Sequence, residues 1–361
     1  PNGVSTMRSG TRWPFLLLLL PALALAQDRG PVAMHHPTRL FSFNTATMGT
    51  VATLQIAARD SSSIADLAYS ALVRFHSADS LLSNWTNDSE IARVNRDAAR
   101  GWTGLDPELA SILETAATVY EESDGAFDPT IEPLVRAWGF VGGTPRVPTP
   151  DQIETAFENV GWQHVQLEEG RIRFAQPGIR LDLGGIAKGH AVDESAAILD
   201  RGGARGYLLD LSGNMVIRGG RPDRPAWRIG IRDPRDELEH LGTLALRDVA
   251  LATSGDYEQF VDASGEAFGH ILDPRTGRPV TGIAQVTVLA PTAMLADAWA
   301  TALFVLGSES GRRIAAERED LSCILIERDA QGALSMWIEA GLRSAYTPHP
   351  ELEGQVELHW F

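Results

Sequence analysis

The sequence contains almost no lysine and almost no cysteine. Of its 31 basic residues, thirty are arginine and only Lys188 is lysine. Lysine places a compact charge where the wider guanidinium does not fit, so the one position that keeps it is a candidate for chemistry, with chance retention as the alternative. Cys323 is the only cysteine, which excludes an internal disulfide. Its apolar neighbours predict a buried, unreactive thiol.

Several common catalytic motifs are also missing. No Gly-x-Gly-x-x-Gly follows an expected strand, and neither a Walker loop, a His-Glu-x-x-His pair, a Cys-x-x-Cys pair nor a Gly-x-Ser-x-Gly elbow is present. These absences disfavour ordinary dinucleotide oxidoreductases, P-loop enzymes, zinc proteases and serine esterases. A formal charge of -16 argues against nucleic acid or an anionic membrane as the main partner. A phosphate-containing ligand would therefore need a metal ion or backbone donors to offset the repulsion.

The first residues have the features of a secretory signal. Met7-Arg8 and Arg12 precede an apolar run over residues 13–26, which ends in Ala24-Leu25-Ala26. We expect a signal peptide over residues 1–26 and an exported, periplasmic, soluble mature chain with no transmembrane span. No cysteine stands at the expected cleavage point, which argues against a lipid anchor there.

The remaining chain alternates irregularly between helical and strand patterns. Consecutive strands between helices favour the α+β class, with mixed, largely antiparallel sheets and packed helices. No change of composition divides the chain, so we treat residues 38–350 as one domain. Helices are expected at 64–82, 106–125, 151–159, 188–202, 294–306 and 309–318. Strands are expected at 51–57, 164–168, 171–175, 179–183, 207–211, 214–218, 227–231, 241–247, 257–262, 267–272, 285–290, 321–327 and 334–338.

Two segments suggest an anion site and a cation site. Residues 181–189 pass from an apolar strand through Gly184-Gly185 into a helix, and such a helix start offers free N–H groups to anions. Lys188 stands in the first turn, where the helix dipole disfavours a cation, which supports a function for it. Asp297 and Thr301 share one helix face and form half of a site for magnesium. Their alternative role is structural, as a helix cap and a hydroxyl bonded to its own helix.

Two further segments are ambiguous when taken alone. Thr253 to Tyr257 is either a ligand-binding turn or a plain loop. His270 stands at an expected strand end before a proline turn, a position where histidine is more often structural than catalytic.

Taken together, these segments resemble the ApbE family of flavin transferases. The resemblance covers nearly the whole mature chain, with its motifs in order. The matching segments are Met48-Gly49-Thr50, Ser83-Asn84-Trp85, Asp88-Ser89-Glu90, Asn95, Gly125 to Thr130, Pro133 to Val135, Trp138 to Phe140, Asp182 to Asp193, Gly213-Asn214, Thr253 to Gly255, His270 to Gly277 and Asp297 to Thr301.

The resemblance implies an ApbE-like, T-fold-related fold and a magnesium-dependent FAD:protein FMN transferase. Such an enzyme splits FAD, joins FMN by a phosphoester to a threonine or serine of an exported acceptor, of the redox-complex subunit type, and releases AMP. The implied FAD-binding residues are Met48, Trp85, Ala126, Phe127, Asp128, Asp182, Lys188 and Leu272. The implied magnesium ligands are Gly185, Asp297 and Thr301. The candidates for catalytic residues are His270 and Asp182.

Two other functions use parts of the same residue set. Hydrolysis of FAD to FMN and AMP needs the same site with water as the nucleophile. A non-enzymatic exported flavin-binding protein needs the aromatic residues but not Asp297 and Thr301, so their presence disfavours it. The sequence departs from the family pattern at His190, where tyrosine is common, and at Ser212, where glycine is usual.

Overall fold

The computed structural model describes residues 38–256, 260–263, 266–352 and 355–361. The chain from Thr38 to Phe361 forms one compact unit. The expected signal peptide, residues 1–26, lies outside the described residues, as do residues 257–259 of the strand expected at 257–262. Among the described residues, no helix has the length and apolar character needed to cross a membrane.

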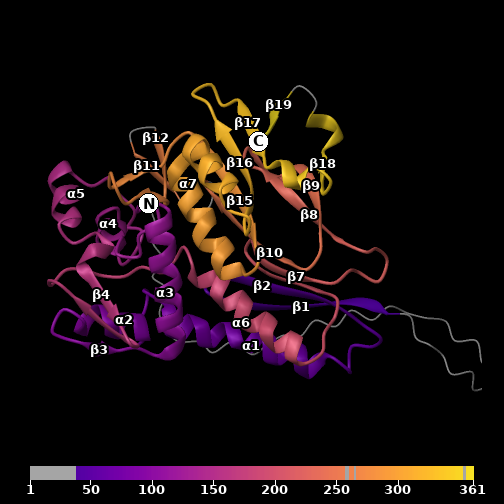
Figure 1. The fold of residues 1–361 in the computed structure, drawn as a ribbon, viewed down its shortest axis with the longest axis horizontal. Helices are drawn as coiled ribbons and strands as arrows, with labels where there is room; N and C mark the ends of the chain where they lie inside the picture. Colours follow the sequence, from indigo (N-terminus) through magenta and orange to yellow (C-terminus); the bar gives the residue numbers. More distant parts are fainter. Residues whose placement is uncertain (1–37, 257–259, 264–265, 353–354) are drawn as a thin grey trace, which may run out of the picture. The chain divides into compact units, whose positions relative to one another are not determined.

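A nine-stranded sheet forms the centre of this unit (Figure 1). Its strands are antiparallel except for the last pair, β17 and β19, which is parallel. In sheet order they are β1 (Arg39–Thr47), β2 (Thr50–Ala58), β6 (Tyr207–Leu211), β7 (Asn214–Arg218), β10 (Val249–Gly255), β15 (Ile283–Ala290), β16 (Ser322–Arg328), β17 (Leu334–Ile338) and β19 (Val356–Trp360).

Three long helices cover one face of this sheet: α1 (Ala65–Leu82), α6 (Ala187–Arg201) and α7 (Ala293–Ala316) (Figure 1). Alternate residues of β2 and β6, among them Leu54 and Leu209, point toward this face and pack with Phe75 of α1 and Leu199 of α6. Burial of these apolar side chains is the main force that holds the helices on the sheet.

A three-stranded sheet covers the opposite face. It consists of β8 (Trp227–Asp233), β9 (Asp236–Leu246) and β18 (Tyr346–Pro348), in the order β18-β9-β8. Trp227, Ile229 and Ile231 alternate with more exposed residues along β8. They belong to one buried cluster with Leu251 and Ile324 of the large sheet. The alternation therefore fixes which face of β8 is buried.

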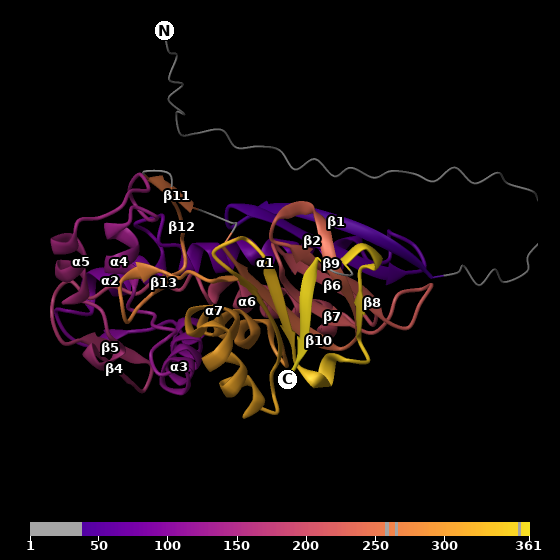
Figure 2. The same cartoon turned by 90° about the horizontal axis from the view of Figure 1, so that it is seen from above.

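The remaining elements lie to one side of the large sheet, at the left in Figures 1 and 2. The helices are α2 (Glu90–Asp97), α3 (Pro107–Glu122), α4 (Glu132–Ala137) and α5 (Pro150–Phe157). The strands are β3 (Thr103–Gly104), β4 (Val165–Glu168), β5 (Arg171–Phe174), β11 (Phe260–Ala263), β12 (Glu266–Gly269), β13 (Leu272–Asp273) and β14 (Arg278–Pro279). A short 3-10 turn at Trp162–His164 lies among them, whereas two others, at Ala340–Leu342 and Pro350–Leu352, stand before and after β18 in the chain. The indole N–H of Trp138, after α4, donates to the carbonyl of Gly277 at 2.9 Å and ties two of these segments together.

Most expected elements are present, and the α+β class with largely antiparallel sheets is confirmed. The helices expected at 294–306 and 309–318 are both present: they follow one another within α7, whose backbone is non-helical at Gly307, where φ is 73° and ψ is 177°. Cys323 is buried, as expected, and burial raises the pKa of its thiol. The sequence patterns did not predict the central strand β10, nor β1, α2, α4, β18, β19 and the two-residue strands β3 and β14.

The strand expected at 179–183 is wrong. The backbone N–H of Leu181 donates to Asn95 Oδ1 at 2.7 Å, and the Leu181 carbonyl accepts from the side-chain amides of Asn95 and Asn84 at 3.0 and 3.2 Å. These side chains satisfy the backbone groups that a neighbouring strand would otherwise pair.

The strand expected at 267–272 is also corrected. It breaks after Gly269, the last residue of β12, and β13 begins at Leu272. His270 therefore lies between two short strands instead of inside one.

Candidate active site

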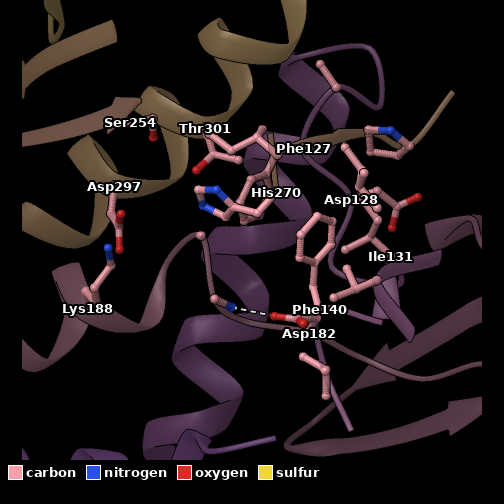
Figure 3. A pocket seen from close by; sticks show the side chains of 18 of the residues that line it. Phe127, Asp128, Ile131, Phe140, Asp182, Lys188, Ser254, His270, Asp297 and Thr301 are labelled. Carbon is pink, nitrogen blue, oxygen red and sulfur yellow. Dashed lines mark hydrogen bonds between the residues drawn. The ribbon is translucent and has the colours of Figure 1, made fainter. Parts of the chain in front are cut away.

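Two adjoining cavities lie between the large sheet and the elements beside it. The small chamber, of about 250 Å³, is lined by residues that include Phe127, Ile131, Phe140, Asp297 and Thr301 (Figure 3). The large chamber, of about 1140 Å³, is lined by residues that include Met48, Thr50, Ser212, Ile231 and Gln285. Both are lined by Trp85, Val141, Asp182, Gly184, Lys188, Thr253 and His270. We call these seven residues the neck, because a ligand that occupies both chambers must pass them.

The glycine turn before α6 forms one wall of the neck. The backbone N–H of Gly184 donates to Asp182 Oδ1 at 2.7 Å, and α6 begins at Ala187, so Lys188 stands in its first turn, as expected. A Cβ on Gly185 would lie 2.9 Å from Thr301 Oγ1. Glycine at this position therefore lets the backbone approach the threonine hydroxyl.

Helix α7 supplies a wall of the small chamber, which Asp297 and Thr301 line. The side chain of Asp297, which is only 4% exposed, accepts from the backbone N–H of Gly189 through Oδ2 at 2.9 Å. A Cβ on Gly189 would lie 2.2 Å from the carbonyl oxygen of Ala293, so α6 and α7 meet this closely only because residue 189 is glycine. Figure 3 shows the ammonium group of Lys188 pointing toward the Asp297 carboxylate.

The donor set suits magnesium held jointly by protein and substrate. Asp297 and Thr301 both line the small chamber, and the backbone of Gly185 lies close to the threonine hydroxyl. All three offer oxygen atoms, the ligands that magnesium prefers. Within the described ranges, no group of three or more His, Cys, Asp or Glu side chains is placed to hold a metal ion. A site of this kind would leave magnesium with open positions for water and phosphate oxygens.

Burial raises the pKa values of two carboxylates of the site. Burial raises the pKa of Asp128, whose Oδ1 accepts from the hydroxyl of Thr130 at 2.7 Å and from its backbone N–H at 2.8 Å. Burial also raises the pKa of Asp182, and the hydrogen bond from Gly184 opposes this shift. A carboxylate that holds its proton above its usual range is a candidate for proton transfer.

Apolar and aromatic side chains line the rest of the small chamber. Phe127 and Leu272 are buried, and Phe140 lies edge-on to His270, with the ring centroids 6.5 Å apart at 77°. Trp85, at the neck, is 70% exposed. Exposed tryptophan in a cavity wall offers a ring system a flat apolar surface to stack on.

The structure brings the expected site residues together. Trp85, Ala126, Phe127, Asp128, Asp182, Gly185, Lys188, His270, Leu272, Asp297 and Thr301 all line the small chamber. Met48 lines the large chamber instead, from the turn between β1 and β2, where its φ is 47°. Their roles remain predictions.

Sequence reasoning missed other lining residues. Ile131 and Val141 line the small chamber, and nothing distinguishes them from ordinary core residues in the sequence. Gln285 and Thr287 of β15 line the large chamber although both are buried. The sequence did indicate these two residues, because polar residues at alternate positions of an otherwise apolar strand lie on the same face of the sheet. That face is therefore not packed against an apolar core at this point.

Replacement of Asp182 by asparagine tests how much the burial of its charge lowers the folding stability. Because the folded state binds the Asp182 proton more tightly than the unfolded state, folding stability falls as the pH rises from the ordinary carboxyl pKa through the raised one. We expect Asp182→Asn to raise the melting temperature of the ligand-free protein, more at pH 8 than at pH 4.5. Thermal unfolding at the two pH values measures this. Glu154→Gln, at an exposed position of α5, is the control and is expected to change neither value.

These features define an α+β protein with a cavity that combines a glycine-led helix start, an aspartate and a threonine one turn apart on a second helix, and aromatic walls. The sequence matches the ApbE family over residues 48–325, and the chain belongs to that family. A Salmonella typhimurium relative named FAD:protein FMN transferase is 32% identical over 296 residues, which cover 79% of this chain and 84% of the relative. By its family the chain is an enzyme of the transferase class.

Solved structures agree with this assignment. The structure of "Flavin Transferase ApbE from Vibrio cholerae" superposes with a TM-score of 0.76 at 27% identity and covers 86% of this chain and 100% of its own. The Pseudomonas stutzeri flavinyl transferase ApbE has a TM-score of 0.74 at 29% identity, with 88% of this chain and 97% of its own covered. The fold is therefore that of the flavin transferases.

Proposed function

We propose that this protein is a magnesium-dependent FAD:protein FMN transferase that modifies a threonine or serine of an exported acceptor protein and releases AMP. The observation that carries the proposal is the arrangement at the neck: a glycine turn that offers N–H groups and Lys188 lie where the two chambers join, and Asp297 and Thr301 line the small chamber beside them. FAD has the matching form, since it carries a ring system on each side of a central pyrophosphate.

The chamber sizes suggest how FAD lies in the site. In a transfer reaction the FMN half leaves attached to a folded protein, whereas the AMP half leaves as a small molecule. The FMN half therefore requires the chamber with more room, of about 1140 Å³, next to Met48 and Trp85. The adenine half then occupies the small chamber, of about 250 Å³, beside Phe127 and Leu272.

The reaction moves one phosphoryl group between two oxygens. The acceptor hydroxyl oxygen forms a bond to the FMN phosphorus, the bond from that phosphorus to the bridging oxygen breaks, and AMP carries that oxygen away. Positioning and charge compensation supply most of the catalysis in such transfers. The N–H groups of the glycine turn and the Lys188 ammonium would bind phosphate oxygens. His270 or Asp182 would take the hydroxyl proton.

Magnesium would be held by Asp297, Thr301 and the backbone of Gly185. When bound, it supplies charge neutralisation at the phosphate oxygens, which a protein with a formal charge of -16 otherwise lacks. Export is part of the proposal: the signal-like residues 1–26 would direct the protein to the periplasm, where its acceptor is exported too.

The transfer assay tests this function. The purified protein is incubated with FAD, magnesium and a threonine-containing domain of an exported redox subunit from the same organism, and the domain is weighed by mass spectrometry. We expect the domain to gain the mass of FMN while AMP appears in equal amount. Free FMN and AMP with an unmodified domain would instead identify a FAD pyrophosphatase. Unchanged FAD would identify a binding protein.

Replacement of the single lysine tests the charge at the neck. Arginine keeps the charge of Lys188 but brings a wider, planar group into the first turn of α6. We expect Lys188→Arg to weaken FAD binding or slow transfer by about tenfold, a loss of about 1.4 kcal/mol. Isothermal titration with FAD and the transfer assay measure the two effects. Arg201→Lys, at the exposed end of the same helix, is the matched control, and a Lys188→Arg protein equal to it would make the lysine an accident of composition.

A further inference from the structure

We propose that the acceptor protein binds as an extended segment that adds to the open edge of β8, beside the large chamber. The proposal rests on the transferase function above, because that reaction requires an acceptor. Three observations on β8 carry it: the strand has an open edge, the edge faces the chamber, and its backbone groups point outward.

Strand β8 ends its sheet. Within the part of the chain that the structure describes, β8 pairs with β9 alone, and the sheet order is β18-β9-β8. An open strand edge presents a row of backbone N–H and C=O groups that another extended chain can pair with. Proteins that bind peptides by strand addition use such an edge.

This edge faces the large chamber. Four consecutive residues of β8, Ile229 to Arg232, line the cavity. Successive side chains of a strand point to opposite faces, so a cavity beside one face would touch alternate residues only. Ile229 and Ile231 are buried against the large sheet, while Gly230 is exposed. Since the side chains of the four residues do not share one face, the cavity must lie along their backbone, at the open edge of β8.

The pairing of β9 shows which backbone groups of β8 point outward. The N–H of Ala245 in β9 donates to the carbonyl of Ala345, just before β18, at 2.9 Å. In an antiparallel sheet the groups of successive residues point to alternate sides, so those of Leu244 point toward β8. Leu244 lies opposite Ile229, and Gly230 lies opposite Thr243, whose groups point away from β8. The N–H and C=O of Gly230 therefore point away from β9, into the open edge.

The spacing of the outward backbone groups on β8 suits an extended peptide better than the flavin ring. The same alternation turns the backbone groups of Arg228 outward, two residues or about 6.6 Å from Gly230. An added strand repeats its own donors and acceptors at this interval, whereas the pyrimidine edge of a flavin meets only one such pair.

The edge also lies close to the reaction. The large chamber that β8 lines is continuous with the neck, where Asp182, Lys188 and His270 are found. A hydroxyl carried by the added segment would thus enter the chamber that holds the FMN half.

Gly230→Pro is the test, with Gly230→Ala as its matched control. Proline removes the outward N–H of residue 230 but no bond to β9, and proline is tolerated at such edge positions. Alanine keeps the N–H. The probe is the acceptor domain that the wild-type protein modifies in the transfer assay. We expect Gly230→Pro to raise the KM for this domain at least tenfold more than the KM for FAD, and Gly230→Ala to leave this ratio near the wild-type value.

A second measurement does not depend on the proline variant. The wild-type protein is mixed with the acceptor domain in which the modified threonine is replaced by valine, and amide hydrogen exchange is followed. We expect slower exchange at Gly230, since its N–H becomes hydrogen-bonded. Unchanged exchange there, or a Gly230→Pro protein with the acceptor KM of Gly230→Ala, overturns the proposal. Equal rises in both KM values also overturn it, because the edge would then hold the flavin. A wild-type protein that modifies no acceptor refutes the transferase function instead.

Discussion

Asp297→Ala is expected to lower magnesium-dependent transfer by at least about 100-fold, because loss of a residue that only hydrogen-bonds to a metal ligand already costs about 10- to 100-fold. Asp297 is the only charged group among the three expected ligands, and it is nearly fully buried, at 4% exposure. The alanine variant loses this charge and also the acceptor for the Gly189 N–H. Its activity would therefore fall for two reasons, of which only one concerns the metal.

Asp297→Asn separates the two reasons. The asparagine amide oxygen can still accept from Gly189, so the contact between α6 and α7 stays intact while the charge is lost. We expect Asn and Ala to lose transfer alike, and only Ala to lower the melting temperature. Magnesium binding by isothermal titration, in the absence of FAD, gives a readout that does not depend on turnover. Thr301→Ser keeps the hydroxyl and is expected to stay within about tenfold of wild type. An Asp297→Asn protein with wild-type transfer at low magnesium would contradict the metal assignment.

The placement of Asp297 and Thr301 side by side in one cavity wall was predictable because its signal is local. Asp297 and Thr301 are four residues apart in one helix, and this spacing by itself places them on the same face. The place of Lys188 in the first turn of a helix was predictable for a similar reason, since an apolar run, two glycines and a helical pattern follow one another directly in the sequence. Local spacing also predicted the long helices and most strands, whose apolar periods are unbroken.

The residues that the sequence did not reveal depend on distant partners. Leu181 lies in an apolar run typical of a strand, but its backbone groups are bonded to the side chain of Asn95, 86 residues away. The apolar pattern around Leu181 contains no information about these hydrogen bonds to Asn95. The same is true of β8, whose strand pattern was expected but whose open edge follows only from its place in the sheet order. The chambers are formed between elements, so their apolar walls, such as Ile131, look like ordinary core in the sequence.

His270→Ala is expected to slow transfer by about 100-fold to 10⁴-fold, the range that a general base contributes. The side chain lies at the neck, in the break between β12 and β13, and lines both chambers. Its ring lies edge-on to Phe140, which is compatible with a structural role as well. The rate alone therefore does not separate a base from a packing residue.

Chemical rescue separates them. Removal of the ring in His270→Ala opens space at the neck, so added imidazole can occupy it and accept the hydroxyl proton. We expect imidazole to restore part of the transfer rate in His270→Ala and none in Asp182→Asn, while FAD affinity by titration stays within a few-fold of wild type in the histidine variant. The opposite pattern would assign proton transfer to the carboxylate: a small loss in His270→Ala with no rescue, and a loss of at least about 100-fold in Asp182→Asn. The raised pKa of Asp182 would then describe the base, and His270 would be a positioning residue held by Phe140.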